Sequence, residues 1–123
     1  MQFSKLEIAV LSEFAIRHPS DKHSILEQTA AAQVTSRENT GKGFRTYMRI
    51  AGTVGKMDAR ILSNVYAEIN SLENLMSFVI FCDEAGKLNT LEGSSVAEYT
   101  TSIDFTNVEF KLSPFLLEDR NLN

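Results

Sequence analysis

The sequence of 123 residues predicts an α+β fold, with two N-terminal helices packed on a mostly antiparallel meander sheet of about five or six strands. Helical periodicity is confined to the first 32 residues, and alternation of apolar and polar residues follows it. Turn residues separate the alternating segments at short intervals, which is typical of strands joined in sequence order. We therefore treat residues 1–123 as a single domain, and we expect the tail 114–123 to fray at its end.

The two helices are predicted from their starts and from their apolar stripes. Ser4 and Glu7 have the spacing of a capping box, and the helix that they begin should end near Arg17. A second helix is expected over residues 21–32, capped by Ser20 or Asp21. The link between the helices is short, as in an αα-hairpin.

Six strands follow in the predicted order. They are expected at 34–39, 44–50, 61–69, 76–82 and 87–92, with a last strand that includes Val108, Phe110 and Leu112. Gly41 and Gly43 mark a hairpin turn between the first two, where positive φ is required. Residues 76–82 are almost continuously apolar, so we expect a central strand that is covered on both faces.

Charge and targeting signals restrict the class of partner. The net charge of −4 argues against nucleic acid, because phosphate binding depends on clustered Lys and Arg, and it permits a basic protein partner. Neither a signal peptide nor a run of the roughly 18 apolar residues that span a membrane is visible, so no membrane partner is expected. The single cysteine, Cys82, lies in an apolar run and favours a reducing compartment, so we expect a cytoplasmic protein.

Catalytic and metal-binding patterns are missing from the sequence. His18 and His23 are the two histidines; they lack metal-ligand spacing and are expected in an exposed loop, so no metal and no cofactor is predicted. No nucleophile elbow is present, and Gly41-Lys42-Gly43 lacks the spacing of a phosphate-binding loop. We therefore name no catalytic residue and favour a protein that is not an enzyme.

Three charged residues form a candidate ligand or ion-pair group, namely Arg37, Glu38 and Glu92. Glu38 and Glu92 each lie at a strand end beside a turn glycine. In an open concavity the two carboxylates could share a proton or act as an acid and base. If an arginine lies between them, an ion pair is the better interpretation.

A second group of residues is predicted on the sheet face opposite to the apolar one. The candidate interface residues are Arg45, Tyr47, Arg49, Tyr66 and Phe81. Aromatic side chains mixed with arginine are typical anchors of protein interfaces. The alternative is that the tail covers this face through Phe115, Leu116 and Leu117.

The chain also resembles a group of small uncharacterised bacterial α+β proteins. The resemblance depends on a helix pair leading into Arg37-Glu38-x-Thr40-Gly41-x-Gly43-Phe44, and on the later segments Phe78-x-Ile80-Phe81 and Gly86-x-Leu88-x-x-Leu91-Glu92-Gly93. It covers about residues 4–112 and departs from the group at 94–101. It implies no activity, cofactor or site residue. Small acidic bacterial proteins of this kind include immunity proteins that neutralise a toxin, which is an analogy of fold alone.

Three functional hypotheses follow. The first is a non-enzymatic protein-interaction module, of which an immunity-like protein that binds a toxin is one form. The alternative is a small-molecule-binding protein or weak hydrolase that uses Glu38 and Glu92. The third is a homodimer joined through an uncovered edge strand or sheet face.

Overall fold

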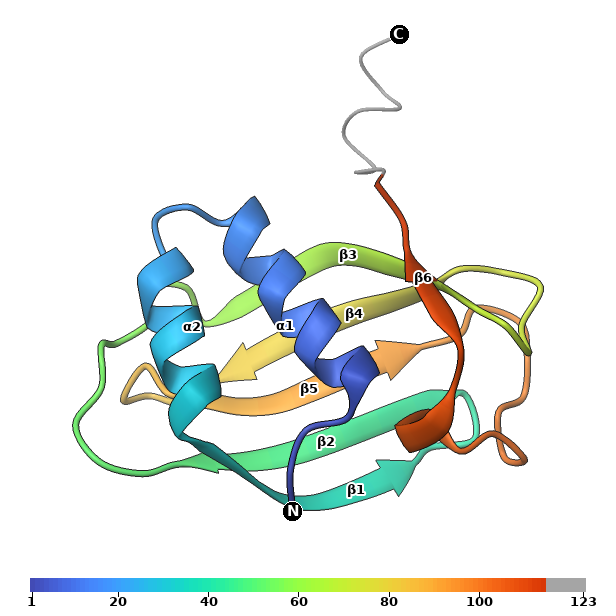
Figure 1. Ribbon diagram of the computed structural model, residues 1–123, viewed down its shortest axis with the longest axis horizontal. Helices are drawn as coiled ribbons and strands as arrows, with labels where there is room; N and C mark the ends of the chain where they lie inside the picture. The colour runs from blue at the N-terminus through green and yellow to red at the C-terminus, as the bar shows by residue number, and fades with distance from the viewer. Residues whose placement is uncertain (115–123) are drawn as a thin grey trace, which may run out of the picture.

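Two helices precede six strands, as the sequence predicts, in a computed structural model that describes residues 1–114 (Figure 1). The elements are α1 (Lys5–Arg17), α2 (Lys22–Ala31), β1 (Ala32–Asn39), β2 (Gly43–Ile50), β3 (Ile61–Ile69), β4 (Met76–Cys82), β5 (Leu88–Ser94), the 3₁₀ helix η1 (Phe105–Asn107) and β6 (Phe110–Leu112). β3 and β4 have the predicted bounds, and the other predicted bounds differ by one or two residues.

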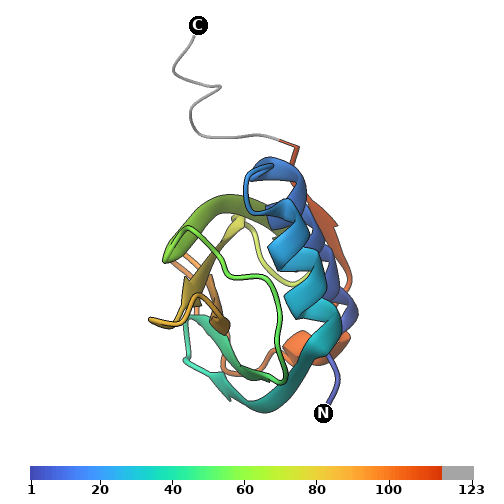
Figure 2. The same ribbon diagram turned by 90° about the vertical axis from the view of Figure 1, so that its left-hand side faces the viewer.

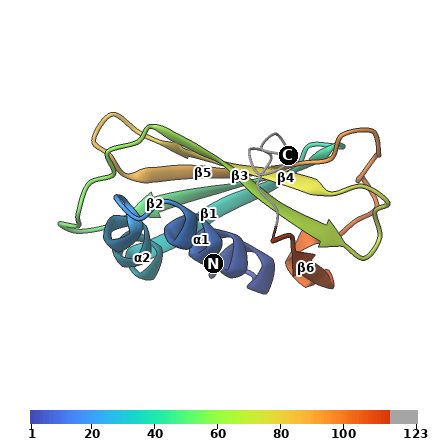
Figure 3. The same ribbon diagram turned by 90° about the horizontal axis from the view of Figure 1, so that it is seen from above.

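One antiparallel sheet holds all six strands in the order β1-β2-β5-β4-β3-β6. The β1–β2 hairpin joins the β3–β4–β5 meander through the pairing of β2 with β5. The sheet curves round the two helices, which lie together on its concave face (Figures 2 and 3). Among the described residues, no helix or strand lies on the convex face (Figure 3).

The start of α1 confirms the predicted capping box. The Ser4 backbone N–H donates to Glu7 Oε1 at 2.7 Å, and the Glu7 N–H donates to Ser4 Oγ at 3.2 Å. These two bonds satisfy backbone donors that the first turn of a helix otherwise leaves without partners. The capping box also fixes the direction in which the Glu7 side chain leaves the helix.

The side chains of α2 hold the connections at one end of the sheet. Asp21 precedes the helix without a side-chain cap bond and instead accepts from the N–H groups of Asp58 and Ala59, at 2.9 and 3.3 Å. Gln28 is fully buried; its amide donates to the carbonyl oxygens of Gly55 and Gly86. The segment 51–60 is thus attached to α2, which its sequence does not predict.

The β1–β2 turn needs its glycines for backbone reasons, as predicted. Gly41 and Gly43 have φ of +86° and +133°. A Cβ at Gly43 would lie 1.9 Å from the carbonyl oxygen of Gly93 on β5. Glycine at position 43 therefore permits the close pairing of β2 with β5.

The core lies between the helices and the concave face, and β4 crosses the middle of it. Met76, Phe78 and Ile80 are fully buried there. Val79 and Phe81 point to the other side and are only half-buried, so the prediction that β4 is covered on both faces is wrong. The predicted cover, Phe115, Leu116 and Leu117, lies outside the described residues.

Candidate functional site

The candidate interface residues lie on the convex face, on three strands. Arg45, Tyr47 and Arg49 of β2 alternate with buried residues of the same strand, so they point away from the helices. Tyr66 of β3 lies between the buried Val65 and Ala67, and Phe81 of β4 follows the buried Ile80. All five side chains therefore lie on one side of the sheet, as the alternation in the sequence predicts.

A row of side chains crosses four strands on this face. Tyr47 pairs with Thr90, Thr90 with Phe81, and Phe81 with Ile61. Residues directly opposite each other in antiparallel strands share a face and contact one another. Ile61 is 59% exposed, while Tyr47 and Phe81 are half-buried. We call these four residues the convex row.

Beside the convex row, Glu38 and Glu92 converge on Arg45, which lies between them. Arg45 Nε donates to Glu92 Oε2 at 2.6 Å, and Arg45 Nη1 lies 3.4 Å from Glu38 Oε1. The Tyr47 hydroxyl also donates to Glu38, at 3.2 Å. The hydrogen bond to Glu92 raises the pKa of Arg45, which keeps the guanidinium charged. The two carboxylates therefore form an exposed ion-pair group on the sheet.

Arg37 is separated from that group because it points to the concave face. A β-bulge between Val34 and Ser36 changes the phase of β1, so Arg37 lies opposite the buried Thr46 and Glu38 opposite Arg45. Simple alternation from the buried Val34 would have given the reverse. The three residues grouped from the sequence thus lie on two sides of the sheet.

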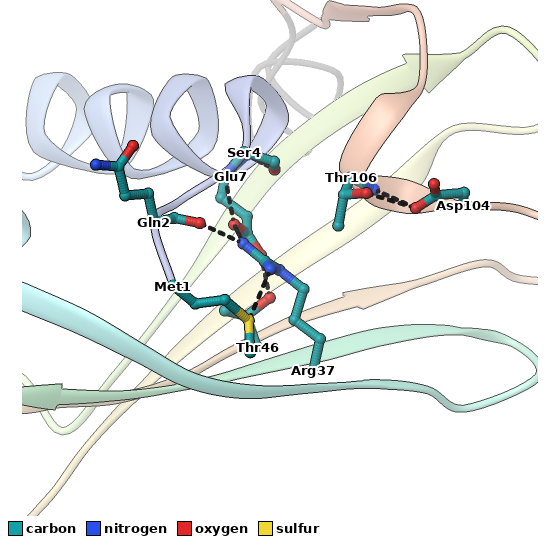
Figure 4. A network of polar contacts seen from close by, with 8 residues as sticks. All are labelled: Met1, Gln2, Ser4, Glu7, Arg37, Thr46, Asp104 and Thr106. Carbon is teal, nitrogen blue, oxygen red and sulfur yellow. Dashed lines mark hydrogen bonds and ion pairs between the residues drawn. The ribbon is translucent and has the colours of Figure 1, made fainter.

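The partner of Arg37 is Glu7 of α1 (Figure 4). Arg37 Nε donates to Glu7 Oε2 at 2.9 Å, and Nη2 donates to Glu7 Oε1 and to the Gln2 carbonyl oxygen, both at 2.7 Å. The Thr46 hydroxyl also donates to Glu7. The side chain of Glu7 is 2% exposed and that of Arg37 20% exposed. This network joins the start of α1 to β1 and β2.

The pKa of Glu7 reflects opposing effects. Burial by itself would raise it, but hydrogen bonds from Arg37, Thr46 and the Ser4 N–H, with the charge of Arg37, lower it overall. Glu7 was identified in the sequence only as a capping residue. Its spacing from Val10, Leu11 and Phe14 puts it in the buried stripe of α1. A carboxylate at a buried position requires a positively charged partner, so this spacing is the sequence signal for such a partner.

A small cavity of about 130 Å³ adjoins this network, between Arg37, Phe44 and Phe105. Ligand pockets commonly measure about 300–1,000 Å³, so the cavity is small for a metabolite. Asp104 lines it and accepts from the hydroxyl and from the N–H of Thr106; these two bonds lower the pKa of Asp104 (Figure 4). The donors of Arg37 are largely used by Glu7 and the backbone. The network is therefore a structural connection and not a ligand site.

The histidines and the cysteine lie apart from the ion-pair groups described above. His18 is half-buried with its ring stacked on Phe14, so its predicted exposed position is wrong, whereas His23 is exposed and lies 3.5 Å from Glu27. Burial, with the charges of Asp21 and Asp83, raises the pKa of the Cys82 thiol to about 11. Within residues 1–114, no three His, Cys, Asp or Glu side chains gather to hold a metal ion.

No family model, no curated protein and no solved structure matches this chain. Within the described part of the chain, neither helix has the length and apolar character needed to cross a membrane.

Proposed function

We propose that this protein is a non-enzymatic protein-interaction module that binds a partner protein through the convex face of its sheet. The convex row carries the proposal. Tyr47, Phe81 and Ile61 are the large side chains of this row, and they lie on three different strands. Among the described residues, no helix or strand covers them (Figure 3). A monomer normally buries such a row against a second layer.

The chemistry around the convex row supports a protein partner. Arg45 and Arg49 lie on the same face, and the Arg45 side chain is 44% exposed. Interfaces are enriched in tyrosine, phenylalanine and arginine, since these side chains offer large contact areas together with polar groups. We place the protein in the cytoplasm, where its single cysteine would stay reduced.

The arrangement of Glu38 and Glu92 favours this function over the small-molecule alternative. Both carboxylates already bind Arg45, and the Glu38 side chain is 51% exposed. A ligand or a reacting group at this place would have to compete with Arg45 and with the Tyr47 hydroxyl for the same carboxylate oxygens.

Affinity purification with a double variant tests the proposal. The wild-type chain, produced in its host with the products of neighbouring genes, should retain a defined partner; an immunity-like protein would retain a toxin. Tyr47→Ser with Ile61→Ser should lose that partner, because the row loses its apolar area. Ile16→Ser with Leu26→Ser is the matched control, since these exposed residues lie on the helices.

Two results would contradict the proposal. One is the recovery of no partner by the wild-type chain. The other is equal recovery by the convex-row variant and by the helix control. A second copy of the chain is also a possible partner, and light scattering of the same two variants distinguishes this homodimer from a heterologous complex.

A further inference from the structure

A groove of about 500 Å³ lies where the β3–β4 connection meets β6. Its apolar part comes from Leu72, Leu75 and Phe110, which are half-buried. Glu98 fixes the β3–β4 connection, because its carboxylate accepts from the N–H groups of Glu73 and Asn74 at 2.9 and 3.0 Å. These bonds hold the backbone of the connection on one side of the groove.

The charge of the groove is strongly unbalanced. Glu68, Glu73 and Glu109 line it, against one cation, Lys111. Within residues 1–114, none of these three carboxylates lies within 4 Å of a cationic nitrogen. A neighbouring hollow of about 400 Å³ also includes Glu109 and adds the carboxylate of Asp104.

The spacing of these carboxylates does not suit a single small cation. In the described part of the chain, no group of three acidic or other metal-ligating side chains is close enough to hold a metal ion. A peptide segment with several separate positive charges would match the carboxylates of the groove. An apolar side chain between those charges would match Leu72, Leu75 and Phe110. Lysine and arginine residues next to leucine or a similar residue have this chemistry.

Glu68 places one wall of the groove on the convex side of the sheet. Glu68 follows Tyr66 by two residues on β3, so both side chains point to the same side of the strand. A partner seated on the convex row could thus extend a segment past Tyr66 into the groove.

We propose that this groove binds a basic segment of the partner protein, in which lysine or arginine side chains flank an apolar residue. The carboxylates attract the cations, and the apolar residue contacts Leu72, Leu75 and Phe110. This proposal rests on the proposed function, because it specifies the charge of the partner.

Binding of a labelled twelve-residue peptide of leucine and lysine, measured by fluorescence anisotropy at low salt, tests the proposal. The groove variant Glu73→Gln with Glu109→Gln should bind it about fivefold more weakly than wild type, since each exposed charge contributes modestly. Asp58→Asn with Glu84→Gln is the control. It removes the same charge at the opposite end of the strands and should change the affinity by less than about twofold.

Three results would overturn the proposal: absence of binding by the wild-type chain, equal losses in the two variants, and equal binding of a peptide with glutamate in place of lysine. Amide chemical shifts separate this failure from failure of the proposed function. Peptide-induced shifts confined to the convex row would reject the groove and leave the interaction function standing. Shifts at residues 70–75 and 109–111 support the groove.

Discussion

Glu7 has two structural roles, of which the sequence indicates only the first. Its backbone and carboxylate complete the capping box, and the same carboxylate binds Arg37 from the concave side of β1. Buried ion pairs repay the cost of desolvation only when their remaining atoms are hydrogen-bonded. Thr46 and the Ser4 N–H supply those bonds here, so the side chain is 2% exposed and still ionised.

Replacing Glu7 by glutamine should destabilise the protein by about 3 kcal/mol at pH 7. This value is the lower end for breaking a buried ion pair, because Arg37 keeps some contact with solvent. Chemical denaturation of wild type and variant measures the difference. Glu38→Gln is the control and should have a much smaller effect, since the Glu38 side chain is 51% exposed. Equal effects would contradict the structural role of the network.

The same pair predicts how stability depends on pH. The folded-state pKa of Glu7 is lowered, so its contribution is fully present above the unfolded value of about 4.3 and is lost as the pH falls through the folded value. Chemical denaturation between pH 6 and pH 2 should therefore show that the difference in unfolding free energy between wild type and Glu7→Gln becomes smaller as the pH falls. A stability difference that stays constant to pH 2 would mean that folding does not lower the pKa of Glu7.

At the scale of elements, the alternation of apolar and polar side chains predicts where the strands lie. Bulges and glycines then decide which face each side chain points to and how closely two strands approach. The bulge in β1 directs Arg37 inward, and Gly43 lets β2 approach β5. Gly93 of β5 has a related role, since a Cβ there would lie within 2.9 Å of carbon atoms of Phe44, Met76 and Phe78. The core side chains use the space that glycine leaves.

Gly41 and Gly43 should respond differently to alanine. Gly41→Ala should cost about 1–2 kcal/mol, because the strain of positive φ is the main effect and the nearest atom, Thr101 Cγ2, is 3.7 Å from the added Cβ. Gly43→Ala should cost clearly more or prevent folding, because the backbone carbonyl of Gly93 must move. Thermal unfolding and soluble yield measure both. Equal stability of the two variants would contradict the close pairing of β2 and β5.

The central position of β4 predicts the effect of shortening Ile80. Ile80→Ala should cost about 2–5 kcal/mol, since the side chain is fully buried beneath the helices. Val79→Ala, on the half-buried convex side of the same strand, should cost about 1 kcal/mol or less. Denaturant titrations test the pair, and a cost below about 1 kcal/mol for Ile80→Ala would contradict the sheet order.

On the scale of the whole molecule, a curled sheet separates a filled concave face from a convex face that no described helix or strand covers. The chain carries a net charge of −4 at pH 7 and has an isoelectric point of about 5.1. Mutual repulsion between copies is therefore weakest near pH 5. Under that condition the convex row is least protected from self-association.

Light scattering should accordingly increase for the wild-type protein at pH 5.1 compared with pH 7.5, at equal concentration and low salt. Tyr47→Ser with Ile61→Ser should reduce the increase, because it removes the apolar area of the row. The helix control Ile16→Ser with Leu26→Ser tests whether any exposed apolar residue has the same effect. If it reduces scattering equally, the convex row has no special part in association.

By itself, the sequence determined the fold class, the capped start of α1, and the strands 61–69 and 76–82. It also determined which residues of β2 point outward. These features depend on periodicity and on caps, which act between residues a few positions apart. The convergence of Glu38 and Glu92 was one of two outcomes that the sequence left open.

Only the tertiary structure decided which charges meet. Glu7 and Arg37 are 30 positions apart, and a bulge of one residue turns Arg37 toward Glu7 and Glu38 toward Arg45. Alternation has a period of two, so it cannot indicate where one extra residue reverses it. The half-buried outer side of β4 was also a tertiary outcome. An apolar run shows that a strand can be buried on both faces. The packing of the other elements decides whether both faces are in fact covered.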